Sequence, residues 1–180
     1  MSKPKKTEKV MLLIGIIYKK EYTIKNICDL LEKRYGDIHS VYLPIDFAWT
    51  DYYKSEMGED LKRSWIAFNY LIYPDDVIGI KWKAFEIENE YLNKNGERMI
   101  NIDIGYIALP RLVLSTFKDF SHRIYLGKHV YAEVTLIYQK KMGWKTLPWT
   151  YIDYADEKAR SYFDDLRKAL IAKHRMSSNE

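Results

Sequence analysis

Cysteine and long apolar runs are both scarce in this sequence. Cys28 is the single cysteine among 180 residues, so the chain can form neither an internal disulfide nor a cysteine-based zinc site. A chain of this size without a disulfide framework is typical of the reducing cytosol, and we expect a cytoplasmic protein. The apolar stretch VMLLIGIIY, residues 10–18, is too short to span a bilayer, and no small-residue cleavage site follows it. We therefore expect a buried strand there and no membrane partner.

Clustered glycines are also missing, which removes the usual nucleotide-binding loops. A P-loop needs GxxxxGK[ST] and a dinucleotide-binding turn needs GxGxxG, because closely spaced glycines let backbone N–H groups approach phosphates. The eight glycines of this chain are scattered singly. The GTPase motif NKxD is absent as well, since residues 93–96 read NKNG. The zinc motif HExxH and the nucleophile elbow GxSxG do not occur. The cofactor therefore stays unknown, with no P-loop, no dinucleotide motif and no zinc motif.

Neither sign of charge dominates once the first nine residues are set aside. The formal net charge is +4, and MSKPKKTEK carries four lysines against one glutamate. A basic arm can contact nucleic acid, but four lysines support that partner only weakly, and no basic stripe follows. We expect a flexible basic tail over residues 1–9, a single α+β domain over residues 10–174 and a disordered tail over residues 175–180.

Hydrophobic periodicity predicts an α+β fold with a ferredoxin-like βαββαβ core. Thr23 is a suitable N-cap and Gly36 a suitable end for the first helix, and Pro74 opens the second. The expected strands cover residues 10–18, 39–47, 61–72 and 98–106. Beyond the core we expect a short helical run over residues 110–117, a β-hairpin and a C-terminal helix.

The expected hairpin spans residues 124–136. Its apolar residues share one parity and should face the core. Keeping both arms on that face requires an odd loop, which residues 127–129 supply. This register places Arg123 opposite Glu133. A loop of two residues would instead place His122 opposite Glu133, but would turn the apolar set of one arm outward.

A dense polar cluster precedes the hairpin, within residues 118–123. It is either the polar end of a helix beside an ordinary cross-strand pair, worth less than about 1 kcal/mol, or a pocket floor that offers hydrogen-bond donors to an anion. In the second interpretation Lys118, His122 and Arg123 contact the anion, and His122 can also exchange a proton near neutral pH.

Two loops combine aromatic and acidic residues. Residues 50–58 form either a surface turn or a pocket wall, and residues 147–154 either a plug with Asp153 as the cap of the last helix or a second wall. We predict a site for a small anionic ligand, such as a nucleotide or a phosphorylated metabolite. Its expected residues are Lys118, Asp119, Ser121, His122, Arg123, Glu133, Asp51, Tyr52, Tyr53, Asp103, Trp149 and Tyr151.

Two other functions stay open at this point. Asp103, Glu133 and His122 have side chains that can bind a metal ion in a phosphoester hydrolase, although their spacing matches no diagnostic motif. A non-catalytic module that binds RNA or protein is the third hypothesis. Whether the protein is an enzyme, which residues would be catalytic and what its oligomeric state is all stay unknown.

Three stretches resemble a known family: FAWTDYYKSEMG, the run from LVLSTFKDFSHRIYLG into YAEVTLIY, and LPWTYIDY. The chain resembles an uncharacterised bacterial and archaeal family catalogued as a domain of unknown function (family 4416), over essentially its whole length. Members are often labelled GTP-binding proteins, so the resemblance implies GTP as a ligand, without motif support from these residues. The family tends to read DPGY and WTYPDY where this chain has Ile104 and Ile152.

Overall fold

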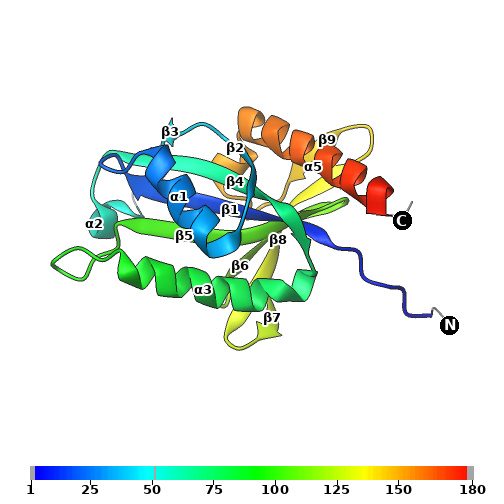
Figure 1. Cartoon of the computed structure of the whole chain (residues 1–180), viewed down its shortest axis with the longest axis horizontal. Helices are drawn as coiled ribbons and strands as arrows, with labels where there is room; N and C mark the ends of the chain where they lie inside the picture. Colours follow the sequence, from blue (N-terminus) through cyan, green and yellow to red (C-terminus); the bar gives the residue numbers. More distant parts are fainter. Residues whose placement is uncertain (1–2, 51, 178–180) are drawn as a thin grey trace.

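The computed structural model describes residues 3–50 and 52–177, with only the backbone of Ser55. The fold is a nine-stranded antiparallel sheet with helices on both faces (Figure 1). Its spatial order is β2-β4-β1-β5-β6-β8-β7, with β3 paired to β4 and β9 paired to β8. The strands are β1 Val10–Lys19, β2 Ile38–Val41, β3 Ile45–Asp46, β4 Leu61–Ile72, β5 Ile100–Ala108, β6 Arg111–Thr116, β7 Ile124–Gly127, β8 Val130–Gln139 and β9 Gly143–Thr146. The helices are α1 Ile24–Tyr35, α2 Lys54–Met57, α3 Val77–Glu90, α4 Ile152–Ala155 and α5 Glu157–Ser177.

The predicted α+β fold with a ferredoxin-like core is confirmed. Strands β2, β4, β1 and β5 lie side by side in that order, and α1 and α3 are the two crossover helices. Thr23 caps α1 in a capping box with Asn26, and Gly36 follows its last residue with φ +85°. Pro74 opens a short 3₁₀ turn, Pro74–Asp76, that leads directly into α3.

The two faces of the sheet bury different helices. Side chains of β1 alternate, so Leu12 and Ile14 pack under α1 and α3, while Met11 and Leu13 pack under α5. In Figure 1, α1 and α3 lie in front of the sheet, and α5 runs along its upper edge toward the C-terminus. Both cores are continuous with central strand β1, which explains its unbroken apolar sequence.

Three predicted elements are wrong or incomplete. The helical run expected over residues 110–117 is absent, and Arg111–Thr116 form strand β6 instead. Pairing with β5 on one side and β8 on the other overrides the preference of Pro110 for a helix start. Residues 39–47 divide around Pro44 into β2 and β3, and β9 was not anticipated. Helix α5 runs to Ser177, so residues 175–177 are helical, and residues 178–180 lie outside the described part of the chain.

The hairpin keeps its predicted register near the polar cluster but not at its turn. Tyr125 pairs with Tyr131, whereas Gly127 pairs with Val130, which leaves a two-residue turn with positive φ at both central residues. The expectation that both arms turn their apolar set inward is wrong, since Ile124 is 70% exposed. Strand β7 is the end strand of the sheet, and Ile124, Tyr125 and Leu126 are all exposed.

Candidate functional site

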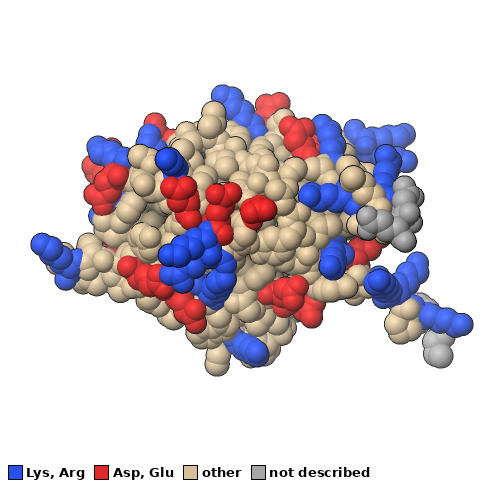
Figure 2. All heavy atoms as spheres, in the orientation of Figure 1, with Lys and Arg blue, Asp and Glu red and all other residues tan. Residues whose placement is uncertain are grey.

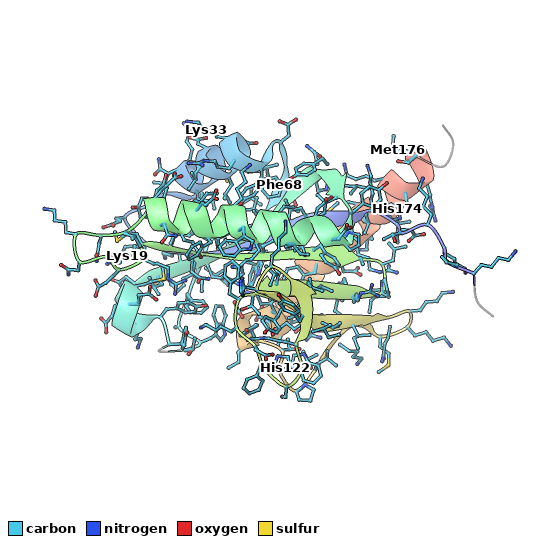
Figure 3. All side chains as sticks on the ribbon, turned by 90° about the horizontal axis from the view of Figure 1, so that it is seen from below. Lys19, Lys33, Phe68, His122, His174 and Met176 are labelled. Atoms are coloured by element: carbon cyan, nitrogen blue, oxygen red, sulfur yellow. The ribbon has the colours of Figure 1, made fainter. Side chains whose placement is uncertain are left out.

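The candidate site lies on the α5 face of the sheet, beyond the part that α5 covers. Under α5 this face carries apolar side chains such as Leu13 and Trp65. One step farther along β1 and β4, the same alternation places Gly15 and Arg63 on this face. A cavity of about 500 Å³ opens there, walled by residues of the loops around 47–53 and 148–152. In Figure 3, His122 marks this region, on the opposite side of the molecule from Lys33 of α1.

Arg63 forms the floor of this cavity, which is the larger of two at this site, and its guanidinium lies between two carboxylates. Its side chain is 1% exposed, its Nη1 donates to Asp103 Oδ2 at 2.8 Å, and its Nε lies 2.9 Å from Asp153 Oδ2. Burial raises the pKa of Asp153, an effect that the charge of Arg63 opposes. The backbone N–H groups at the start of α5 donate to the side chain of Asp156. The expectation that Asp153 caps the last helix is therefore wrong.

Aromatic rings and a glycine complete the surroundings of Arg63. Its guanidinium lies 4.9 Å from the ring centroid of Trp65 and 5.0 Å from that of Tyr154. A Cβ atom on Gly15 would lie 2.5 Å from the Tyr154 hydroxyl and 2.9 Å from Arg63 Nη2. Gly15 is therefore required for the close approach of these two side chains to β1.

A chain of polar side chains extends the floor toward α2. Asn101 donates to Asp103 at 3.0 Å, and Arg98 donates to Asn101 at 2.9 Å. Arg98 also donates to both carboxylate oxygens of Glu56, each at 2.7 Å, and these hydrogen bonds lower the pKa of Glu56. This pair ties the short helix α2 to the start of β5.

Glu133 is held by Arg123 and His122, the two residues that the sequence placed as its alternative partners. Its Oε2 lies 2.8 Å from Arg123 Nε, which donates to it, and 3.0 Å from His122 Nε2. The Glu133 side chain is 2% exposed, so its pair with Arg123 is buried, whereas exposed ion pairs contribute less than about 1 kcal/mol. The other oxygen, Oε1, is buried without a hydrogen-bond partner among the described residues.

Arg123 and His122 also fix the loop that walls the larger cavity. Arg123 donates to the carbonyl of Lys118 and to the hydroxyl of Tyr151, each at 3.0 Å. Burial and the charge of Glu133 raise the pKa of Tyr151 to about 12. The ring of His122 stacks on Trp149 at 4.8 Å, with 10° between the planes. These contacts place an aromatic wall next to the buried carboxylate.

Two side chains of the same loop donate hydrogen bonds to backbone carbonyls of β8. Trp149 Nε1 donates to the Val134 carbonyl at 2.8 Å, and the Thr150 hydroxyl donates to the Thr135 carbonyl at 2.5 Å. Because two side chains of the loop bind adjacent residues of one strand, the wall is positioned before any ligand arrives.

Lys118 lies where the two walls meet. Its Nζ donates to the Tyr52 hydroxyl and lies 4.6 Å from the centroid of that ring. No carboxylate forms an ion pair with Lys118 in residues 3–50 and 52–177. The charge of Lys118 also contributes to the lowered pKa of Glu56, but its ammonium group forms no direct ion pair with a carboxylate among those residues.

A second cavity, of about 270 Å³, adjoins the first where β5 and β6 separate. The strands pair over Gly105–Ala108 of β5. Before Gly105, side chains of α3 supply hydrogen bonds to the backbone of β5. Ile102 N donates to Glu88 Oε1 at 2.6 Å, and Lys81 Nζ donates to the Ile102 carbonyl at 3.0 Å. Burial raises the pKa of Glu88. The opening between the strands is thus polar and lined from both faces of the sheet.

The structure brings together most of the predicted site residues. Seven of them line the larger cavity: Tyr52, Tyr53, Asp103, Lys118, Arg123, Trp149 and Tyr151. Glu133 lines the smaller one, and His122 joins Glu133 to Trp149. Asp119 and Ser121 are exposed and line neither cavity. Asp51 lies outside the described residues.

Sequence reasoning missed Arg63, Arg98, Lys81 and Glu88. A signal for Arg63 exists in LKRSWIAF, where the arginine shares the parity of Leu61 and Trp65 in a strand that is otherwise buried. No comparable signal marks the α3 residues, because their role depends on the separation of β5 from β6.

The three residues proposed as metal ligands do not gather around one point. Asp103 contacts Arg63 and Asn101, while His122 contacts Glu133. Among the described residues, no group of three or more histidine, cysteine, aspartate or glutamate side chains is placed to hold a metal ion. The hydrolase hypothesis stays an untested prediction.

The fold and the site define an α+β protein with a ferredoxin-like core and a cavity lined by aromatic rings and basic side chains on one sheet face. Residues 8–170 match the family described as Domain of unknown function (DUF4416). The chain belongs to this family, as the resemblance predicted. Comparisons with curated proteins and with solved structures found no match.

The surface charges and the helices bear on what binding to nucleic acid or a membrane would require. Figure 2 shows basic and acidic side chains intermingled over the face that carries α1 and α3. Within residues 3–50 and 52–177, no helix has both the length and the apolar character needed to cross a bilayer.

Proposed function

We propose that this is a cytosolic protein that binds a small anionic ligand, a nucleotide or a phosphorylated metabolite, in the larger cavity. The observation that carries the proposal is the position of Lys118, which has no carboxylate partner in the described part of the chain and lines both cavities beside Arg123. An anionic group at this point would gain a counter-ion without breaking an existing ion pair.

The remaining walls suit a ring. Trp49, Tyr53, Trp149 and Tyr151 line the larger cavity, and flat aromatic surfaces stack favourably on bases and pack against sugars. A volume of about 500 Å³ falls within the usual range for sites that enclose a small molecule. The combination of aromatic walls with a lysine that forms no ion pair among the described residues supports a ligand that has both a phosphate and a ring.

Thermal shift and calorimetry test this proposal directly. Purified protein is screened with GTP, GDP, ATP, ribose 5-phosphate and inorganic phosphate. A ligand at 100 times its Kd stabilises the folded state by about 2.7 kcal/mol, and each kcal/mol shifts the Tm of a domain of this size by roughly 2–4 °C. A shift with phosphorylated ring compounds is expected. No shift with any phosphorylated compound contradicts the proposal.

Lys118→Ala is the matching variant, because Lys118 is exposed and its loss leaves no buried charge. We expect it to weaken binding about tenfold or more, in line with the loss of a charge-assisted hydrogen bond, at unchanged Tm of the free protein. Lys33→Ala removes an equally exposed lysine on the opposite side of the molecule (Figure 3) and should leave binding unchanged. Equal affinities of the two variants would place the anion elsewhere.

A further inference from the structure

We infer that Glu133 accepts a hydrogen bond from a hydroxyl group of the ligand, so that the site takes a ribonucleotide or a related sugar-bearing anion. This inference rests on the proposed function and adds the chemical class of the ligand. It depends on the environment of a single carboxylate and on the relation between the two cavities.

The carboxylate is oriented by one of its oxygens. Arg123 Nε at 2.8 Å and His122 Nε2 at 3.0 Å both lie at Glu133 Oε2. Arg123 is itself fixed by the Lys118 carbonyl and the Tyr151 hydroxyl, and His122 by stacking on Trp149. Rotation of the carboxylate would break these contacts, so Oε1 has a fixed direction.

The second oxygen lacks what buried carboxylate oxygens normally have. Glu133 is 3% exposed, and Oε1 has no hydrogen-bond partner among the described residues. Buried polar atoms are nearly always hydrogen-bonded, and an exception calls for a specific explanation. Glu133 lines the smaller cavity, so a group that enters this cavity can supply the missing donor.

The chemistry of the missing donor follows from its neighbours. A negatively charged oxygen repels the phosphate and attracts an O–H or N–H group. Because one oxygen is available, a single donor such as a sugar hydroxyl satisfies it. Lys118, Arg123 and Tyr151 line both cavities. A ligand can therefore place its phosphate at Lys118, its ring in the larger cavity and its sugar hydroxyl at Glu133.

Deoxy analogues test this on the unmodified protein. Calorimetry with GMP, 2′-deoxy-GMP and 3′-deoxy-GMP, with the same AMP series, and with ribose 5-phosphate and its 2-deoxy analogue compares ligands that differ by one hydroxyl. A site built to hydrogen-bond a hydroxyl discriminates strongly against the analogue that lacks it. We expect one hydroxyl position to weaken binding about 10- to 100-fold on removal.

Glu133→Gln and Glu133→Asp identify the acceptor. In Glu133→Asp the hydroxyl and deoxy ligands should bind within about threefold of each other, because the shorter side chain withdraws the acceptor oxygen. In Glu133→Gln the discrimination should fall but not vanish, because a neutral amide hydrogen-bonds a hydroxyl more weakly than a carboxylate does. Glu21→Gln, at an exposed position outside both cavities, should keep the full discrimination. If neither Glu133 variant folds, the wild-type comparison decides.

The possible failures are distinguishable. Equal binding of every parent compound and its deoxy analogues overturns this inference and leaves the proposed anion site intact. Discrimination that persists undiminished in the Glu133 variants overturns the role of this residue. Absence of binding by all of these compounds overturns this inference, and the proposed function falls with it only if GTP, GDP, ATP and inorganic phosphate also produce no thermal shift.

Discussion

The part of the sheet face under α5 and the part beyond it are built from the same strands but bury different chemistry. Under α5, Leu13 and Trp65 pack in an apolar core. Beyond α5, Arg63 and Glu133 are just as buried, yet each is held by ion pairs. The helix gives the apolar side chains a partner, whereas the open part must satisfy its charges with one another.

The buried ion pairs beyond α5 are not required for stability in the way that the apolar core under α5 is. Replacing a buried ion pair by well-packed apolar residues is often neutral or stabilising, so buried ion pairs are weak support for a stabilising role. A chain selected for stability alone could have extended α5 over apolar residues. The network of Arg63, Asp103 and Asp153 therefore fits the floor of the proposed site better than a purely stabilising role.

The largest expected effect is the removal of Arg63. Arg63→Ala removes the cation that pairs with the buried Asp153 and with the partly exposed Asp103. We expect a loss of about 3–5 kcal/mol in the free energy of unfolding, measured by urea denaturation. Leu13→Ala, in the region under α5, should lose a comparable 2–5 kcal/mol through its cavity.

A second substitution separates the two causes of lost stability, unpaired charge in Arg63→Ala and an apolar cavity in Leu13→Ala. Asp153→Asn removes one of the uncompensated charges and should restore part of the stability of Arg63→Ala, but none of that of Leu13→Ala. Equal effects of Asp153→Asn in both backgrounds would show that the charges of the open region do not determine its stability.

The contrast between local and long-range contacts also explains which elements of the fold could be predicted from the sequence. Periodicity identified the core strands and both crossover helices, because apolar residues under a helix follow a local pattern of two or 3.6 residues. The wrong prediction over residues 110–117 has the opposite origin: β6 is a strand because two partners distant in sequence pair with it. Local preference around Pro110 carried no information about those partners.

The same limit applies to the site. Glu133 and its partners Arg123 and His122 were predicted together because a hairpin register is a local property. Arg63 and Glu88 were missed because their partners lie 40 and 14 residues away, on other elements. Asp119 and Ser121 were included only for their nearness in sequence, and they point to no cavity in the structure.

A smaller effect is expected from Gly15→Ala, which probes the close packing at the border of the two regions. The added Cβ would lie 2.5 Å from the Tyr154 hydroxyl and 2.9 Å from Arg63 Nη2, so we expect a loss of about 1–3 kcal/mol from overpacking.

Gly79→Ala on α3 is the matched control for this glycine. Apart from its chain neighbours and the backbone of its own helix, no described atom lies within 4 Å of a Cβ added there. Alanine favours a helix over glycine by roughly 0.5–1 kcal/mol. Urea denaturation should therefore show opposite signs for the two substitutions. A neutral Gly15→Ala would mean that Arg63 and Tyr154 move aside without cost.

The smallest effect concerns Glu56 and Arg98, at the outer end of the polar network. The hydrogen bonds from Arg98 lower the pKa of Glu56 in the folded protein. A lowered folded pKa contributes stability that is present above the ordinary pKa of the carboxyl and is lost as the pH falls through the folded value. Glu56→Gln should therefore lower stability slightly at neutral pH, by less than about 1 kcal/mol for a partly exposed pair, and by progressively less as the pH falls below the ordinary pKa of the carboxyl. Parallel stability curves of wild type and variant between pH 7 and pH 3 would show that this pair, unlike the buried ones near Arg63, adds nothing to the open region.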